Sequence, residues 1–216
     1  MFSFRYRSSF HFQYLAHAEG VDEWLRLAWV AVERIPWDRR AAIEVAVTAA
    51  YADALADTEF RGTSLGLPAL FDRLFWKSFQ KVFHRDPATG ALRGWNVRIE
   101  QRGLTAESVP LRRRSGAPVT FGHFEVVPLR AAAPPPRPTG PGLLLDYGRG
   151  GNRRLDPAGL LRDPVVALHR GSVELLLGWT YVELGPLRLS TPSYFALVPE
   201  RPLTHRVLPP RPRRAT

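Results

Sequence analysis

Residues 142–200 read GLLLDYGRGGNRRLDPAGLLRDPVVALHRGSVELLLGWTYVELGPLRLSTPSYFALVPE, and this stretch decides the fold. It contains four apolar runs, at 143–147, 165–169, 173–183 and 194–198. Each run stops at a short cluster that contains Gly, Pro, Asn or Ser. Short apolar runs separated by turn residues are typical of the strands of an antiparallel meander. The sequence therefore predicts a β-barrel or a β-sandwich.

Turn residues set the connections between these strands. Gly185–Pro186 predicts a hairpin, and Ser190–Ser193 predicts a further turn before the last run. Three more strands are expected upstream, one beginning near Phe75, one at 91–101 and one at 119–129. The total is seven or eight strands without the strand–helix alternation of a parallel sheet. An up-and-down barrel closes the edges of such a sheet and can hold one small ligand.

The N-terminal part of the chain has a different pattern. Apolar residues recur at helical spacing in 22–35 and 38–56, and a short helix is expected at 68–74. Residues 2–14 alternate aromatic and polar side chains, which predicts an extended strand. That strand either covers the core of the domain or forms an arm that contacts a second chain.

The predicted fold class is α+β, an antiparallel β-barrel with an N-terminal helical cap. We expect four segments along the chain: an aromatic arm or edge strand at 1–20, a helical section packed on the barrel at 21–74, the barrel at 75–200 and a Pro/Arg-rich tail at 201–216.

Composition restricts the class of protein. The 216 residues are 45% hydrophobic, enough for a core, and contain no cysteine, which excludes disulfides and thiol chemistry. No run approaches the roughly 18 apolar residues of a membrane span, and the N-terminus lacks a signal-peptide core. The net charge of +10 comes almost entirely from arginine, which coding bias explains. We expect a soluble, cytoplasmic protein without a DNA or RNA partner.

A series of short motifs resembles a known family. The motifs are FWK at 75–77, GWN at 94–96, GHF at 122–124, LLDYG at 144–148, LRDPVV at 161–166, LLLGWTYVELG at 175–185 and SYFALVPE at 193–200. Their order along residues 75–198 resembles the small lipocalin-like (calycin-type) β-barrels of bacteria. The resemblance implies a lipocalin-like barrel that binds a hydrophobic ligand, apolar or amphipathic, in its cavity, in some members with isomerase or cyclase chemistry.

The densest set of polar residues surrounds Asp146. This carboxylate stands inside an apolar strand, so it must be paired, exposed or protonated. Arg162 and Asp163 open the next strand, and either a structural Arg–Asp clamp or an acid/base pair fits this pattern. His123, on another strand, could move a proton near neutral pH. Arg162 could instead hold a ligand carboxylate.

Aromatic residues provide the other signal, because aromatic walls with a few polar groups make up small-molecule sites. The main hypothesis is a protein that binds a small hydrophobic molecule, with Arg162 as polar anchor. The expected lining is Trp76, Trp95, Tyr147, Trp179 and Tyr181, with His123.

Two alternatives remain open. The first is an isomerase, cyclase or hydratase that uses His123 with Asp146 or Asp163 as acid and base. The second is an interaction module that forms a homodimer through residues 2–14. We expect no cofactor and no metal, because the histidines lack metal-ligand spacing and the GRGG turn at 148–151 lacks the features of a phosphate-binding loop.

Overall fold

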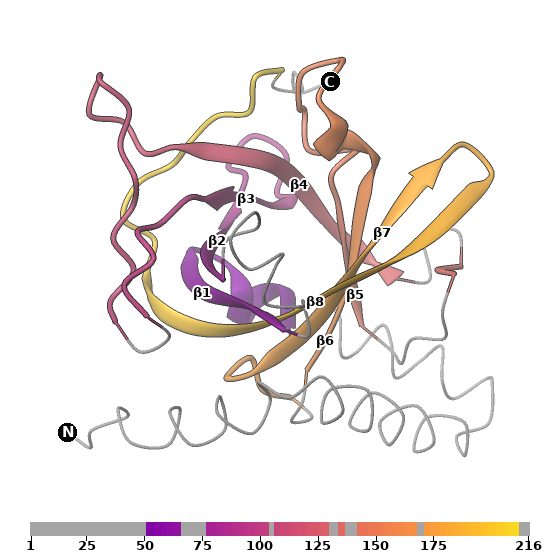
Figure 1. Cartoon of the computed structure of the whole chain (residues 1–216), viewed down its shortest axis with the longest axis horizontal. Helices are drawn as coiled ribbons and strands as arrows, with labels where there is room; N and C mark the ends of the chain where they lie inside the picture. The colour runs from indigo at the N-terminus through magenta and orange to yellow at the C-terminus, as the bar shows by residue number, and fades with distance from the viewer. Residues whose placement is uncertain are drawn as a thin grey trace.

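The structure, a computed structural model, describes residues 51–65, 77–103, 106–129, 134–136, 142–167 and 171–211. Eight antiparallel strands close into one barrel in the order of the chain (Figure 1). The strands are β1 (Thr58–Leu65), β2 (Ser78–Arg85), β3 (Leu92–Val97), β4 (Thr120–Pro128), β5 (Leu143–Asp146), β6 (Leu161–Ala167), β7 (Leu176–Leu184) and β8 (Leu187–Pro202). A short 3-10 helix, η2 (Pro157–Leu160), precedes β6. The predicted antiparallel barrel is confirmed.

The first strand lies in a range that the sequence pattern placed in the helical section. β1 reads TEFRGTSL, and it pairs with β2 on one side and with β8 on the other, which closes the barrel. The sequence of this strand does not show the usual alternation of apolar and polar residues. On the face that points into the barrel, Gly62 follows Phe60, and on the outer face the polar residues Glu59, Arg61 and Thr63 are buried. The barrel therefore begins at residue 58 and not at residue 75.

The last strand also differs from the prediction. Leu184 and Leu187 pair across the predicted hairpin turn, in which Gly185 has a φ of 60°. After the hairpin turn, β8 continues as one strand through residues 190–193. Its register with β7 shifts there, opposite the segment between Trp179 and Tyr181. A bulge of this kind bends a strand without ending it. Ser and Thr residues there indicated a turn, but they lie on a bent strand.

The inward face of the barrel wall carries the main apolar cluster. Because side chains alternate along a strand, register partners on adjacent strands share a face. Phe60, Phe83, Phe124, Leu145 and Leu197 belong to this cluster and are almost completely buried. Smaller buried clusters occupy the outward face, one of them around Trp179 and Tyr181 and another around Trp95.

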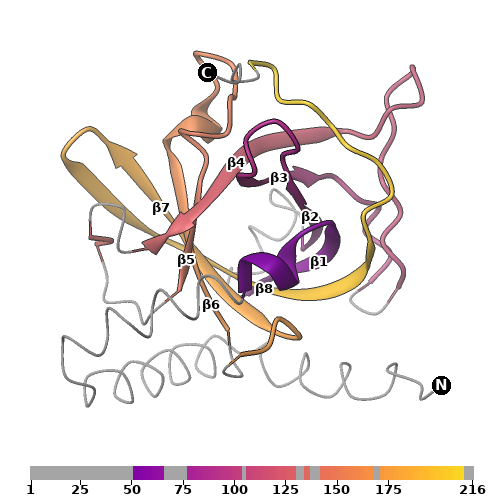
Figure 2. The ribbon, with the colours of Figure 1, turned by 180° about the vertical axis from the view of Figure 1, so that it is seen from behind.

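A helical turn at residues 51–55 packs onto the inward cluster. Tyr51 and Leu55 are buried in that cluster, and the Tyr51 hydroxyl accepts a hydrogen bond from the Gly171 amide at 2.8 Å. Figure 2 shows this turn, in indigo, lying beside β1 and across the ring of strands. The rest of the predicted helical cap and the arm at 2–14 lie outside the described residues. Within the described ranges, no helix has the length and apolarity needed to cross a bilayer.

The segment that follows β8 packs on the outside of the barrel. Leu203 and Val207 lie against the outward cluster of Val82, Trp95 and Val97. The Arg211 amide donates to the Gly151 carbonyl at 2.9 Å. The predicted Pro/Arg-rich tail thus has defined contacts through residue 211.

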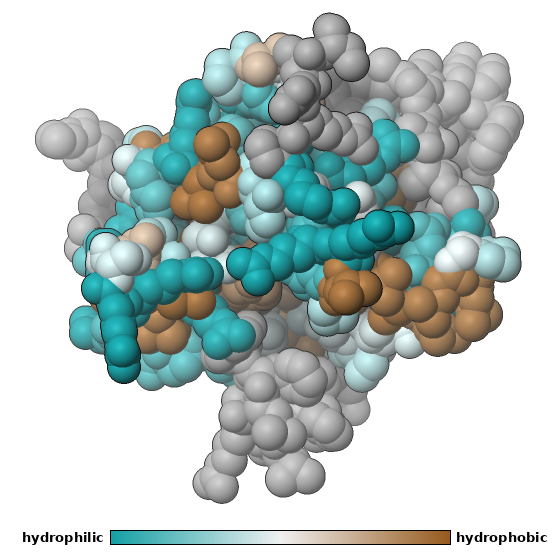
Figure 3. Space-filling model, turned by 90° about the horizontal axis from the view of Figure 1, so that it is seen from above, coloured by the Kyte–Doolittle hydropathy of each residue, from teal (hydrophilic) through white to brown (hydrophobic). Residues whose placement is uncertain are grey.

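Polar side chains cover much of the surface seen in Figure 3, and apolar side chains gather at its right-hand side. Among the described residues, the exposed apolar side chains include Leu184, Leu187 and Leu189 at the β7–β8 hairpin.

Candidate functional site

A buried lysine lies inside the barrel wall. Lys81 on β2 is 2% exposed, and it shares the inward face with its register partners Phe60 and Asn96. Its Nζ atom donates to Asn96 Oδ1 at 2.8 Å, to the Tyr147 hydroxyl at 2.6 Å and to Asp163 Oδ2 at 3.1 Å. These three acceptors match the three hydrogens of an ammonium group.

Asp163 on β6 is the anionic partner of this lysine. Its Oδ2 atom also accepts a hydrogen bond from the Tyr147 hydroxyl at 2.7 Å, and its Oδ1 atom accepts one from Thr180 at 2.8 Å. The Asn96 amide donates to the Gly122 carbonyl at 3.1 Å. We call Lys81, Asn96, Tyr147, Asp163 and Thr180 the interior cluster. Each of its members has a hydrogen-bond partner, as a buried polar group requires.

Four aromatic rings surround the ammonium group. The Nζ atom of Lys81 lies 5.5 Å from the ring centroid of Phe79, 5.3 Å from those of Phe124 and Tyr147, and 5.0 Å from that of Phe195. These distances fall within the range at which a cation is attracted to the face of an aromatic ring. The interior cluster is thus a polar centre in an aromatic wall.

Inward-facing glycines make room for three of the four rings. Gly62, Gly94 and Gly178 are the register partners of Phe79, Phe124 and Phe195, respectively. A Cβ atom at any of these glycines would overlap the ring of its partner. Each ring therefore lies over the backbone of the neighbouring strand, along the wall of the barrel.

A fourth glycine positions the tyrosine. Gly122 has a φ of 54°, which favours glycine, and it lies where the register of β3 and β4 shifts. A Cβ atom there would lie 2.8 Å from Asn96 Nδ2 and 3.0 Å from a ring carbon of Tyr147. The absence of a side chain at Gly122 thus leaves room for Asn96 and Tyr147 beside Lys81.

Burial changes the acid–base properties of the cluster. Removal from water lowers the pKa of Lys81, and the carboxylate of Asp163 opposes this effect. Burial also raises the pKa of the Tyr147 hydroxyl well above its usual value, and the negative charge of Asp163 raises it further. Loss of a proton is therefore easier for this lysine than for a solvated lysine, and harder for this tyrosine than for a solvated tyrosine.

The predicted partner of Asp146 is Arg162, on the other face of the wall. Arg162 Nε lies 3.2 Å from Asp146 Oδ1, and a terminal nitrogen of the same guanidinium lies 2.9 Å from Glu183 Oε2. Arg149 contributes a further contact with Asp146 at 3.3 Å. This network joins β5, β6 and β7 from outside, as the structural clamp predicts.

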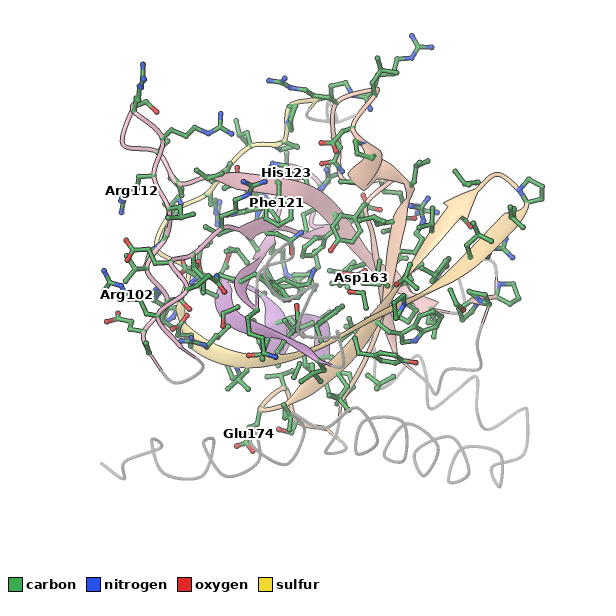
Figure 4. All side chains as sticks on the ribbon, in the orientation of Figure 1. Arg102, Arg112, Phe121, His123, Asp163 and Glu174 are labelled. Carbon is green, nitrogen blue, oxygen red and sulfur yellow. The ribbon has the colours of Figure 1, made fainter. Side chains whose placement is uncertain are left out.

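His123 lies on the outward face, beside Trp95. Their ring centroids are 6.2 Å apart, and the ring centroid of His84 lies 5.3 Å from that of Trp95. Burial lowers the pKa of His123 to about 4, and the charge of His84 contributes in the same direction. In Figure 4 the labelled side chains of His123 and Asp163 lie well apart.

The structure thus divides the predicted site residues between the two faces. Tyr147 and Asp163 meet in the interior cluster, whereas His123, Asp146 and Arg162 lie outside it. Trp95, Trp179 and Tyr181 belong to outward clusters, and Trp76 lies outside the described residues. The roles that the sequence suggested for these residues remain predictions.

Lys81, Asn96 and Thr180 are the members of the cluster that the sequence did not single out. One signal could have identified Lys81. It alternates with Phe79 and Phe83, so it stands on the apolar side of a strand, and it is one of only two lysines in a chain with 30 basic residues.

The chain matches no family model, and no curated protein and no solved structure is detectably similar to it.

Proposed function

We propose that the protein binds a small apolar or amphipathic molecule inside the barrel, with an oxygen-bearing group of that molecule held by the interior cluster. The observation that carries the proposal is a fully hydrogen-bonded Lys81–Tyr147–Asp163 set within an aromatic wall. Small-molecule sites have this composition, mostly apolar with a few converging polar groups. Barrels of eight strands can hold one small ligand.

Energetics support a role beyond packing. A buried ion pair is often no more stabilising than apolar residues of the same volume, because both charges lose their hydration. The Lys81 and Asp163 side chains are each 3% exposed. A carbonyl, carboxylate or hydroxyl oxygen of the ligand would replace one of the acceptors that Lys81 and Tyr147 now have, because all their hydrogens are already donated.

Native mass spectrometry tests the proposal on protein purified from its own host. We expect a bound small molecule that dissociates on denaturation. Lys81→Met should lose it, whereas Arg162→Gln, on the other face of the wall, should keep it. In calorimetric titrations, 1-decanol and decanoic acid should bind to the wild type and to Arg162→Gln but not to Lys81→Met. Bare wild-type protein that binds neither probe, or equal occupancy in Lys81→Met, would contradict the proposal.

A second candidate is an isomerase, cyclase or hydratase working in the same interior. The direct contact of the Tyr147 hydroxyl with Asp163 favours it, since two groups in hydrogen-bond contact can pass a proton. The bound molecule should then exchange hydrogen with deuterated water, and Tyr147→Phe should stop the exchange. Retention of the molecule without exchange would favour binding alone.

We propose a lipocalin-like barrel whose predicted helical section caps one mouth; support comes from the motif order and from the packing of Tyr51 and Leu55 on the inward cluster. A cytoplasmic location and a homodimer through residues 2–14 rest on the sequence alone.

A further inference from the structure

Among the residues that the structure describes, Lys81 provides a primary amine in a setting that suits covalent chemistry. Lys81 is almost completely buried, has four aromatic rings around it, and touches a hydroxyl and a carboxylate that can carry protons. Lysine amines desolvated in apolar pockets form imines with carbonyl compounds.

The choice of lysine is itself informative. The chain has 30 Lys and Arg residues, of which only Lys77 and Lys81 are lysines. Other partly or largely buried ion pairs in the described part of the chain contain arginine in place of lysine. Their cations are Arg61, Arg93, Arg162 and Arg201. A guanidinium stays protonated and does not form an imine, whereas an amine can lose its proton.

We propose that Lys81 binds an apolar aldehyde or ketone covalently, as an imine, with Tyr147 and Asp163 handling the protons. This inference rests on the proposed function, because it names the class of ligand for the same interior. The aromatic rings suit an unsaturated or aromatic carbonyl compound, which stacks on them.

The reaction balances without an oxidant or a reductant. The ammonium of Lys81 first passes one proton to Asp163 Oδ2, which lies 3.1 Å away. The free amine then adds to the carbonyl carbon, so that a C–N bond forms and the C=O π bond opens. The carbonyl oxygen takes a proton from the Tyr147 hydroxyl, and the tyrosine recovers one from the nitrogen. The hydroxyl group leaves with the proton of Asp163 as water, and a C=N bond forms; the product is a protonated imine whose charge the carboxylate of Asp163 balances.

Two features of the interior cluster fit this sequence of steps. Tyr147 hydrogen bonds both to Nζ of Lys81 and to Oδ2 of Asp163, so one hydroxyl can serve the nitrogen and the departing oxygen. Burial lowers the pKa of Lys81, which makes the loss of its proton easier.

The test is reductive trapping with the full-length protein. Trans-cinnamaldehyde and nonanal serve as probes, and borohydride converts any imine to a stable amine that intact mass and peptide mapping detect. We expect one adduct per chain, at Lys81, in the wild type and in the matched control Lys77→Arg. Lys81→Arg keeps the positive charge but should show no adduct. Tyr147→Phe should slow trapping by about 100-fold or more, since a general acid or base typically contributes about 100- to 10,000-fold.

Several results would overturn the inference. One is labelling of Lys77 or of the terminal amine at the same rate as Lys81; another is labelling of Lys81→Arg as fast as the wild type. If Lys81→Arg does not fold, peptide mapping of the wild type and of Lys77→Arg still shows whether Lys81 carries the adduct.

Cinnamyl alcohol separates this inference from the proposed function, since it can bind but cannot form an imine. Calorimetric binding of the alcohol without an adduct at Lys81 would refute the imine and leave the binding proposal standing. Failure of both alcohol and aldehydes to bind, with bare protein from the host, would refute both.

Discussion

Nζ of Lys81 lies 3.1 Å from Oδ2 of Asp163, and the two residues come from strands on different parts of the barrel, β2 and β6. Since both side chains are 3% exposed, water screens their charges poorly. The pair therefore couples two distant parts of the chain across the interior of the fold.

Removing one member of this pair should destabilise the protein strongly. Lys81→Met or Asp163→Leu leaves the opposite charge buried without its partner, which costs about 3–5 kcal/mol in the free energy of unfolding. The double variant should lose much less stability than the sum of the losses in the two single variants. Urea unfolding gives the free energy of unfolding of the wild type and of the three variants.

The exposed pair Arg85–Asp53 supplies the control for that cycle. Its atoms are 2.6 Å apart, but its side chains are 40% and 84% exposed. We expect a coupling below about 1 kcal/mol there. Equal coupling in the two pairs would mean that burial does not determine the strength of the interior pair.

The sequence predicted the architecture of the barrel because hydrophobic runs and turn residues are local signals. The hairpin at Gly185–Pro186 is an example, since the two residues of the turn are adjacent in the chain. The sequence pattern failed to identify β1. Gly62 interrupts the apolar face of this strand, and long-range contacts bury three polar residues on its outer face. Glu59, for example, accepts hydrogen bonds from Arg201 and Thr204 near the other end of the chain.

The candidate site was predictable only in part, for a similar reason. Asp146 and Asp163 were both recognisable as charged residues near apolar strands, but their side chains point to opposite faces of the wall. The register of β5 with β6 places the two carboxylates on opposite faces, and a shift of one residue would bring both to the same face. Lys81 was overlooked because its partners come from three other strands or connections.

Gly178→Ala should destabilise the barrel by about 1–3 kcal/mol, because the new methyl group overlaps the ring of Phe195. A second substitution, Phe195→Leu, should recover part of the loss by clearing the space. Gly159→Ala is the control, since a Cβ atom there would meet nothing within 4 Å and should change stability by less than about 0.5 kcal/mol. Thermal and urea unfolding give these differences. Equal effects of the alanine at 178 and 159 would exclude the proposed packing of rings on glycines.

Stability should fall as the solution becomes acidic, through His123. Its folded-state pKa is lowered to about 4 by burial and by the charge of His84, with Asp156 acting in the opposite direction, against an ordinary value of 6.5. Between pH 6.5 and about 4 the unfolded chain binds a proton that the folded chain does not, so the free energy of unfolding decreases as pH falls, by about 2 kcal/mol.

Replacing the titrating ring tests this origin of the pH dependence. His123→Phe keeps an aromatic ring beside Trp95 but cannot bind a proton, so its unfolding free energy should fall less over the same pH range. His205→Gln, at an exposed position, should behave as the wild type does. The explanation would fail if His123→Phe lost as much stability on acidification as the wild type.

The segment after β8 should stabilise the outward face of β2 and β3. Leu203→Ala with Val207→Ala removes apolar contacts with the cluster of Val82, Trp95 and Val97, and we expect a loss of about 1–3 kcal/mol. Faster hydrogen exchange in β3 should accompany it. Leu208→Ala, at a side chain that is 77% exposed, is the control and should have little effect. Unchanged exchange in the double variant would show that the segment does not protect β3.

Closure of the barrel has a consequence for biosynthesis. The hydrogen bond between Glu59 and Thr204 joins residues 145 positions apart, and the pairing of β1 with β8 spans almost the same distance. During translation β1 leaves the ribosome long before its second partner has been made, so one of its edges stays unpaired for most of the synthesis. The final seam forms only after β8 has emerged, and a chain that stops before β8 keeps an open edge that can pair with other nascent chains.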